Sequence, residues 1–131
     1  MVEINTYSLK ADGNKQLSKN FKVKEFACQD GTDTIFIARE LPMVLQYIRM
    51  RTGKAVTINS AYRTDKHNKS VGGVEGSQHL YGTAADIKVS GYTPNTLATI
   101  AREIMPDWGG VGIYDWGIHV DMREAKADWN G

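Results

Sequence analysis

Apolar residues recur at helical spacing in two segments of this 131-residue chain. The first segment follows Thr32 and Asp33, either of which could cap a helix. Its apolar positions fall on one helical face and are Ile37, Leu41, Val44, Leu45 and Ile48. Because proline is tolerated mainly in a first turn, Pro42 predicts a helix that begins near residues 39–41 or is kinked there. Gly53 is well placed to end it.

The second helical segment is predicted to begin at Thr93, with Pro94 in its first turn. Its apolar face ends before Pro106 and consists of Leu97, Ile100, Ala101 and Ile104. Residues 1–30 are polar and contain glycine, and we expect them to form an N-terminal arm with short extended pieces. The predicted anchors of this arm on the body are Phe21, Val23 and Phe26.

Four short segments have the β-branched or alternating pattern of strands. They cover residues 55–59, 83–89, 109–114 and 117–122, and a tight turn at Asp115 and Trp116 joins the last two. The polar, glycine-rich residues 60–76 predict a long loop, which in so small a domain is usually functional or disordered. The whole pattern predicts an α+β fold: a single domain over residues 1–131, with an antiparallel β-sheet and about two main helices.

Composition narrows the class of protein. The chain is 41% hydrophobic and 24% charged, as in ordinary globular domains, and its net charge of +1 argues against a nucleic-acid binder. The single cysteine, Cys28, excludes an intramolecular disulfide and a cysteine-rich zinc finger, and its apolar neighbours predict that it is buried. No apolar run approaches the roughly 18 residues of a membrane helix. We expect a monomer without a membrane span.

Two short stretches hold residues with metal-binding chemistry. His79 and Asp86 lie in residues 77–86, and His119 lies in residues 117–121. Two imidazoles and a carboxylate leave a fourth position open on zinc, as in catalytic rather than structural sites. The alternative is that each residue has a structural role, as a loop cap, a surface hydrogen-bond acceptor and a half-buried histidine. Spacing alone leaves both interpretations open.

Alternation along the predicted strands places these side chains opposite the core. His119 and Asp121 share one face of their strand, and Ile118 and Val120 occupy the other. Asp86 likewise lies opposite an apolar stripe in residues 83–89. Both strands therefore present a potential ligand on the face away from the core, which predicts a metal site in a cleft on the sheet.

The same stretches resemble the zinc D-alanyl-D-alanine carboxypeptidases and related peptidoglycan endopeptidases, whose zinc scaffold the hedgehog signalling domain shares. The pattern is Ser-x-His-x-x-Gly-x-Ala-x-Asp, followed about thirty residues later by His-Val-Asp. Here it consists of Ser77, His79, Gly82, Ala84, Asp86, His119, Val120 and Asp121. Residues 60–64, Ser-Ala-Tyr-Arg-Thr, also resemble the family's Ser-Gly-Tyr-Arg-Ser, with Ala61 replacing the glycine. The resemblance spans about residues 21–123.

The resemblance implies one zinc ion held by His79, Asp86 and His119, with water as the fourth ligand. It implies that Arg63 stabilises the developing oxyanion or holds a substrate carboxylate, although a surface ion pair is the alternative for this residue. The implied substrates are peptidoglycan stem peptides or cross-links, cut next to a D-amino acid. Ser77 is expected to bond a backbone group or the substrate, and Trp116 to line the cleft, for which Tyr114 and Trp108 are further candidates.

The sequence departs from the family at the group that would accept a proton from the zinc-bound water. Relatives carry Glu or Asp three residues before the last histidine, or a histidine two residues before it. Here those positions are Trp116 and Gly117, and neither can accept a proton. Asp121 is the favoured candidate because it shares the strand face of His119, although it could instead orient that ring. Asp115, in the turn, is the second candidate.

Two other functions stay open. The missing acid at Trp116 suits a catalytically inactive, zinc-stabilised domain that binds wall peptides or proteins. A zinc hydrolase that acts on an amide outside the cell wall is the other alternative.

The first residues lack a basic region followed by an apolar stretch, so we expect no signal peptide and synthesis in the cytoplasm. Action on the cell wall would follow release or export, which fits a phage-encoded lysis enzyme and an exported bacterial enzyme alike. We expect His67 to pack its own loop.

Overall fold

The computed structural model describes residues 2–131 and has the predicted α+β class. Its N-terminal elements are β1 (Ile4–Ser8), α1 (Leu9–Asp12), β2 (Gln16–Ser18), β3 (Phe21–Lys22), the 3₁₀ helix η1 (Val23–Phe26) and β4 (Thr34–Ala38). They are followed by α2 (Glu40–Thr52), β5 (Val56–Ser60), α3 (Asp65–Ser70), the 3₁₀ helix η2 (Gln78–Tyr81) and β6 (Ala84–Val89). The last elements are α4 (Pro94–Ile104), β7 (Gly110–Tyr114), β8 (Gly117–Asp121) and β9 (Ala127–Asn130).

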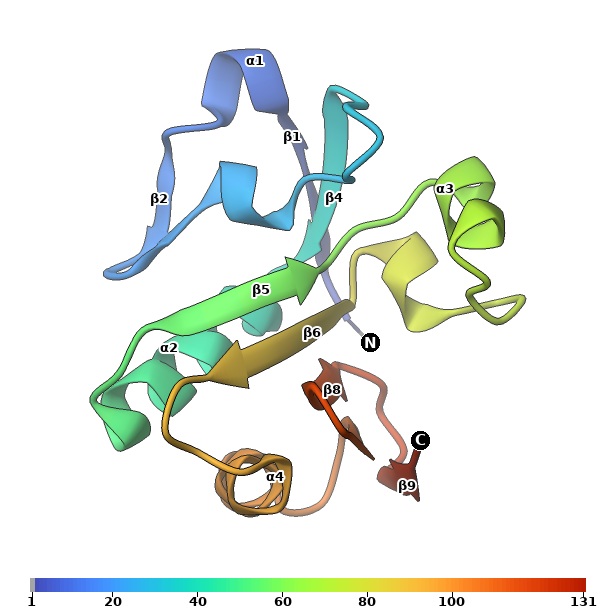
Figure 1. The fold of residues 1–131 in the computed structure, drawn as a ribbon. Coiled ribbons are helices and arrows are strands. Elements are labelled where there is room, and N and C mark those ends of the chain that lie inside the picture. Colours follow the sequence, from blue (N-terminus) through green and yellow to red (C-terminus); the bar gives the residue numbers. More distant parts are fainter. Residues whose placement is uncertain (1) are drawn as a thin grey trace.

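A five-stranded sheet in the order β5-β6-β8-β7-β9 forms the centre of the fold. Neighbouring strands are antiparallel, except that β9 runs parallel to β7. Helix α2 packs against β5 and β6, and α4 packs against β7 and β8, so the two main helices cover one face of the sheet (Figure 1). The apolar stripe that includes Ile87, Ile118 and Val120 is fully buried, as expected for the face beneath these helices.

The two main helices begin and end close to the predicted positions. Pro42 lies in the first turn of α2, so the helix needs no kink, and Gly53 ends it with a left-handed φ of 65°. In α4, the Thr93 side chain accepts a hydrogen bond from the backbone of Thr96, and Pro94 occupies the first turn. Both helix predictions are therefore confirmed in their main features.

The prediction that Ile37 belongs to the first helix is wrong. Ile37 lies in β4, which pairs with β1 in a separate two-stranded sheet, because the run Thr34–Ala38 is rich in β-branched residues. Asp33 does not cap α2 either. Its carboxylate accepts hydrogen bonds from the backbone of Lys10 and the hydroxyl of Ser8, at 2.8 Å each, and so holds α1 against the start of β4.

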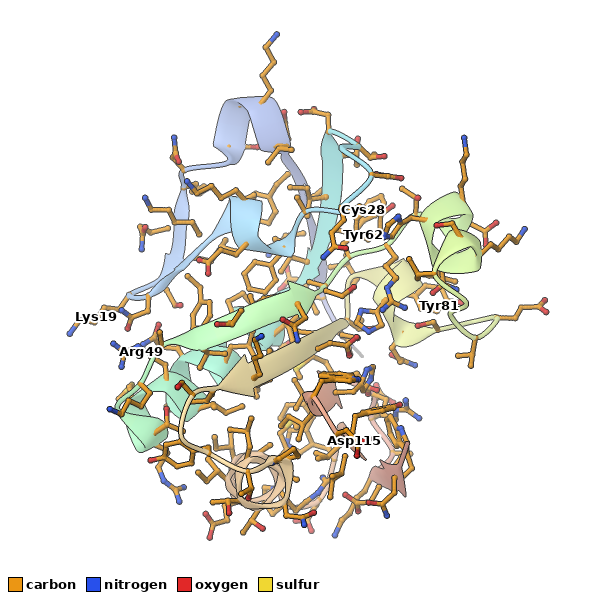
Figure 2. All side chains as sticks on the ribbon, in the orientation of Figure 1. Lys19, Cys28, Arg49, Tyr62, Tyr81 and Asp115 are labelled. Carbon is orange, nitrogen blue, oxygen red and sulfur yellow. The ribbon has the colours of Figure 1, made fainter. Side chains whose placement is uncertain are left out.

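The predicted loop at residues 60–76 contains a short helix, α3, at Asp65–Ser70. The side chain of Thr64 caps this helix by accepting a hydrogen bond from the backbone of His67, which explains why a polar segment becomes helical. Cys28 is buried as predicted and lies next to Tyr62 (Figure 2). Within residues 2–131, the helices are too short or too polar to cross a lipid bilayer.

Candidate metal centre

The three predicted ligands come from η2, β6 and β8. The hydroxyl of Ser77 accepts a hydrogen bond from the backbone N–H of His79 at 3.2 Å and so starts η2. Gly82 ends η2 in the left-handed conformation, and the chain then enters β6. Asp86 on β6 and His119 on β8 are direct partners in the strand register, so the sheet itself places their side chains together.

The side chains of His79, Asp86 and His119 converge on one point. His79 Nε2 lies 3.1 Å from Asp86 Oδ1, and His119 Nδ1 lies 3.0 Å from the same oxygen. One donor atom from each residue lies within 4.8 Å of the others. Relative exposures of 3%, 9% and 8% show that the cluster is almost closed to solvent.

In each of the three side chains, the second nitrogen or oxygen forms a hydrogen bond with another group of the protein. His79 Nδ1 donates to the backbone oxygen of Ala61 at 2.6 Å, because a carbonyl can only accept. His119 Nε2 donates to Asp121 Oδ2 at 2.8 Å, and Arg63 donates to Asp86 Oδ2 at 3.3 Å. In neutral imidazoles these bonds leave lone pairs on the converging nitrogens, beside a carboxylate oxygen. Such a group of acceptors can hold a cation between them, and its donor types are those of a zinc site.

The charges of the cluster are mutually dependent. Burial opposes ionisation of Asp86, but hydrogen bonds with His119 and His79 outweigh it and hold its pKa well below the ordinary range. Burial disfavours the charged form of His119, but hydrogen bonds with Asp121 and Asp86 outweigh it and raise the pKa of the ring. Two ionised carboxylates therefore flank His119, and the site favours an added positive charge.

Asp121 lies behind His119, on the far side of the ring from Asp86. It is fully buried and forms an ion pair with Arg123, whose Nη2 lies 2.7 Å from Asp121 Oδ2. Arg123 also lies over the ring of Trp129, 5.1 Å from its centroid. Arg123 was not predicted from the sequence, although it continues the alternation of His119 and Asp121, two residues after Asp121 and just beyond the end of β8.

A pocket of about 500 Å³ opens over the cluster. Its charged walls include Arg63 and Arg123, and the glycine-rich loop after α3 contributes Val71 and Val74. The aromatic residues that line it are Tyr114, Trp116 and Trp129. Trp116 is stacked on Tyr114 with ring centroids 4.9 Å apart. Ser77 lines the pocket as well, whereas Trp108 is not among its lining residues.

The structure does not bring the two candidate proton acceptors into this pocket. Asp115 is exposed in the turn between β7 and β8 (Figure 2) and lines a different pocket with Lys88 and Pro94. The carboxylate of Asp121 is enclosed behind His119. Among the described residues that line the metal pocket, Asp86 is the only one with a carboxylate.

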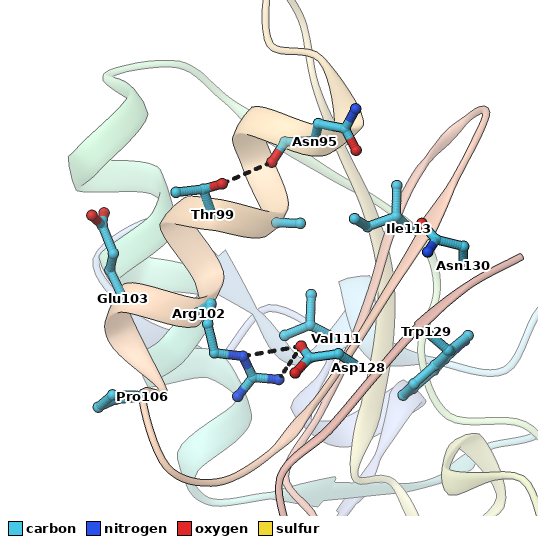
Figure 3. A pocket seen from close by; sticks show the side chains of 11 residues that line it. Asn95, Thr99, Arg102, Glu103, Pro106, Val111, Ile113, Asp128, Trp129 and Asn130 are labelled. Atoms are coloured by element: carbon cyan, nitrogen blue, oxygen red, sulfur yellow. Dashed lines mark hydrogen bonds and ion pairs between the residues drawn. The ribbon is translucent and has the colours of Figure 1, made fainter.

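A larger pocket, of about 660 Å³, lies between α4 and strands β7 and β9 (Figure 3). Arg102 crosses it and donates to Asp128 at 2.8 Å, and it also bonds backbone oxygens of the segment before β7. These bonds hold β9 against the rest of the sheet. None of the three predicted ligands lines this pocket, although Trp129 is shared with the metal pocket.

The fold and the cluster together define an α+β protein with a candidate His/Asp/His metal site. A model of the peptidase M15 family matches residues 19–121, and the chain therefore belongs to that family. The family resemblance found in the sequence is thus confirmed, and membership supports a metallopeptidase. A search of curated proteins gave no match.

Proposed function

We propose that this protein is a zinc metallopeptidase that hydrolyses peptide bonds in peptidoglycan stem peptides or cross-links. The observation that carries the proposal is the convergence of three acceptor atoms whose partner atoms are all fixed by the protein. His79, Asp86 and His119 would hold one zinc ion. When bound there, zinc supplies Lewis acidity, which polarises a scissile carbonyl and activates a water molecule.

Arg63 is placed to act on both the cluster and the substrate. Its Nε donates to Ser60 and its two terminal nitrogens donate to Asn68 and Asp86, so three of its five N–H groups are used by the protein. The remaining N–H groups belong to a residue that lines the metal pocket. We propose that they bind the oxygen on which negative charge develops, or a carboxylate of the substrate.

Asp121 is proposed as a positioning residue. Its bond to Nε2 fixes the ring of His119 with Nδ1 toward the cluster, and the ion pair with Arg123 keeps the carboxylate ionised. Asp115, the other carboxylate named from the sequence, lies in the turn next to Trp116 and outside the metal pocket, and substitution tests whether it accepts the proton. Ser77 serves as the cap that positions His79, and Trp116 offers an exposed aromatic face to the substrate.

Digestion of isolated murein tests this function. Purified protein should contain one zinc per chain by elemental analysis and should release muropeptides with new amino and carboxyl termini, detected by mass spectrometry. His119→Ala should lose both zinc and cleavage. Zinc-loaded protein that releases nothing would refute the peptidase assignment.

A zinc-stabilised domain that binds wall peptides without cutting them is the second candidate. The specific observation in its favour is that Asp86, a proposed ligand, is the only carboxylate among the described residues lining the pocket. The same experiment separates the two functions, because a binding domain would retain muropeptides on the zinc-loaded protein and leave their masses unchanged.

A further inference from the structure

A second pocket adjoins the metal pocket. It has a volume of about 390 Å³ and shares four lining residues with the metal pocket: Arg63, Val71, Asp86 and Trp116. Its other lining residues are Gln29, Asn59, Ser60 and His67. Because the two pockets have Asp86 in common, they form one groove that passes this proposed metal ligand, while His79 and His119 line the metal pocket alone. We call the part lined by Asn59 and His67 the side pocket.

The side pocket has polar groups that the protein itself leaves unused. Within residues 2–131, the side-chain amide of Asn59 and the ring of His67 form no hydrogen bond or ion pair. Gln29 uses its amide nitrogen to donate to the backbone oxygen of Asn59, so its amide oxygen is left to accept. Buried or half-buried polar groups are normally satisfied by protein, water or ligand. This arrangement is therefore suited to a polar ligand.

The entrance of the groove is apolar. Val71 and Trp116 line both pockets and are 51% and 43% exposed, although large apolar side chains usually lie inside a protein. They come from different parts of the fold, Val71 from the end of α3 and Trp116 from the turn between β7 and β8. A chain lying along the groove would contact both.

We propose that the side pocket binds a further peptide unit of the substrate, so that the protein holds the peptide on both sides of the scissile bond. A peptide unit has one donor and one acceptor, which matches the mixed donors and acceptors of Asn59, Gln29 and His67. A carboxylate is a poorer match, because the residues that line the side pocket but not the metal pocket include no lysine or arginine. This inference rests on the proposed function, since it assumes that the metal pocket takes a peptide.

Peptide binding to the zinc-loaded protein tests the proposal by NMR titration. The two probes are a stem pentapeptide and the D-alanyl-D-alanine dipeptide, which is too short to reach both pockets. The pentapeptide should shift the side-chain signals of Asn59 and His67. Asn59→Ala should raise its Kd by about five- to tenfold, the loss of one hydrogen bond, and should leave the Kd of the dipeptide unchanged. Asn95→Ala, in the pocket beside α4, is the matched control and should leave both constants unchanged.

The outcomes separate the side pocket from the peptidase function. An unchanged Kd for the pentapeptide in Asn59→Ala, equal weakening of both peptides, or unmoved signals of Asn59 and His67 would each overturn the side pocket. Mass spectrometry of the same samples reports cleavage independently. Pentapeptide held in the side pocket without cleavage would refute the peptidase function alone, whereas cleavage with no effect of Asn59→Ala would refute the side pocket alone.

Discussion

The carboxylate of Asp121 has no exposed surface, and each of its oxygens is already used by the protein. Oδ1 accepts from the backbone of Gly110 and from the backbone and Nε of Arg123, while Oδ2 accepts from His119 and from Arg123 Nη2. Burial opposes its ionisation, but hydrogen bonds with His119 and Arg123 outweigh it and lower the pKa of Asp121. Because both oxygens of this carboxylate already accept hydrogen bonds, Asp121 is a poor proton acceptor for a water molecule. The same bonds make it well suited to orient the imidazole ring of His119.

We therefore expect Asp121→Asn to act on metal affinity. Loss of the ionised partner of His119 should weaken zinc binding by about 10- to 100-fold, measured by competition with a chromophoric chelator. Turnover should recover when zinc is supplied in excess, because the reacting groups are unchanged. Zinc retained at full affinity with turnover abolished would instead assign Asp121 as the base.

Asp115→Asn tests the second candidate proton acceptor. Asp115 is exposed and does not line the metal pocket, so zinc affinity should stay within about twofold of the wild type. If Asp115 accepts the proton, turnover on murein should fall by about 100-fold or more, as is typical when a general base is removed. Unaltered turnover in this variant would exclude Asp115 from catalysis.

The 3₁₀ helix η2 is attached to the β1–β4 sheet through Gly82. The carbonyl oxygen of Gly82 accepts a hydrogen bond from the backbone N–H of Ala38 at 2.8 Å. A Cβ at position 82 would clash with the backbone oxygen of Phe36. Gly82 also has a φ of +75°, which disfavours any other residue. The glycine of the family motif thus permits a close backbone contact beside the helix that carries His79.

Gly82→Ala should lower the free energy of unfolding more than Gly91→Ala. Both positions have positive φ, so each substitution costs about 1–2 kcal/mol in backbone conformation. Only Gly82 has the close contact, since a Cβ at Gly91 meets nothing within 4 Å, and overpacking should add about 2 kcal/mol. Urea unfolding of both variants measures the difference. Equal losses would show that the contact with Phe36 relaxes freely.

The junction of α1 and β4 should make stability depend on pH. Hydrogen bonds from the backbone of Lys10 and the hydroxyl of Ser8 lower the pKa of Asp33. A carboxyl group whose pKa is lower in the folded state stabilises the protein above its unfolded pKa, and this contribution is lost as the pH falls through the folded value. The melting temperature of the wild type should therefore exceed that of Asp33→Asn at about pH 6, and the difference should shrink below about pH 4. Asp107→Asn, at an exposed position, is the control, and a difference that stays constant with pH would contradict the expectation.

The elements that the sequence predicted correctly are those with a single unambiguous period. The helix face of α4 and the alternation of β8 are of this kind, whereas the pattern that located α2 wrongly included Ile37. β4 was missed because Ile37 fits both the strand and the helix that follows, with no glycine or proline between them. β9 was missed because its four residues gain their order from parallel pairing with β7, from which β8 separates it in the sequence. The proposed ligand set follows from local motifs, whereas the roles proposed for Asp121 and Arg123 depend on contacts that spacing alone does not specify.

The cluster of His79, Asp86 and His119 connects segments that are distant in sequence. His79, Asp86 and His119 come from three elements, and Ala61 and Arg63, which hold two of them, follow β5. The bonds that His79 and His119 form with Asp86 Oδ1 lie beside the proposed metal. A zinc ion would therefore act as a cross-link among η2, β6 and β8, and it would remove the repulsion among the converging acceptors.

Removal of zinc should accordingly lower the stability of the entire fold. A ligand that binds only the folded state stabilises it by about 4 kcal/mol at a free concentration near 1,000 times its Kd. For a chain of this size that corresponds to a melting temperature about 15 °C lower after EDTA treatment, measured by circular dichroism. Restoring zinc should restore the melting temperature, and magnesium, which prefers oxygen ligands in octahedral geometry, should not. His119→Ala should start from the lower temperature and respond little to EDTA. A wild-type protein whose melting temperature ignores both EDTA and zinc would contradict a metal at this site, since three buried acceptors would then be stable without a cation.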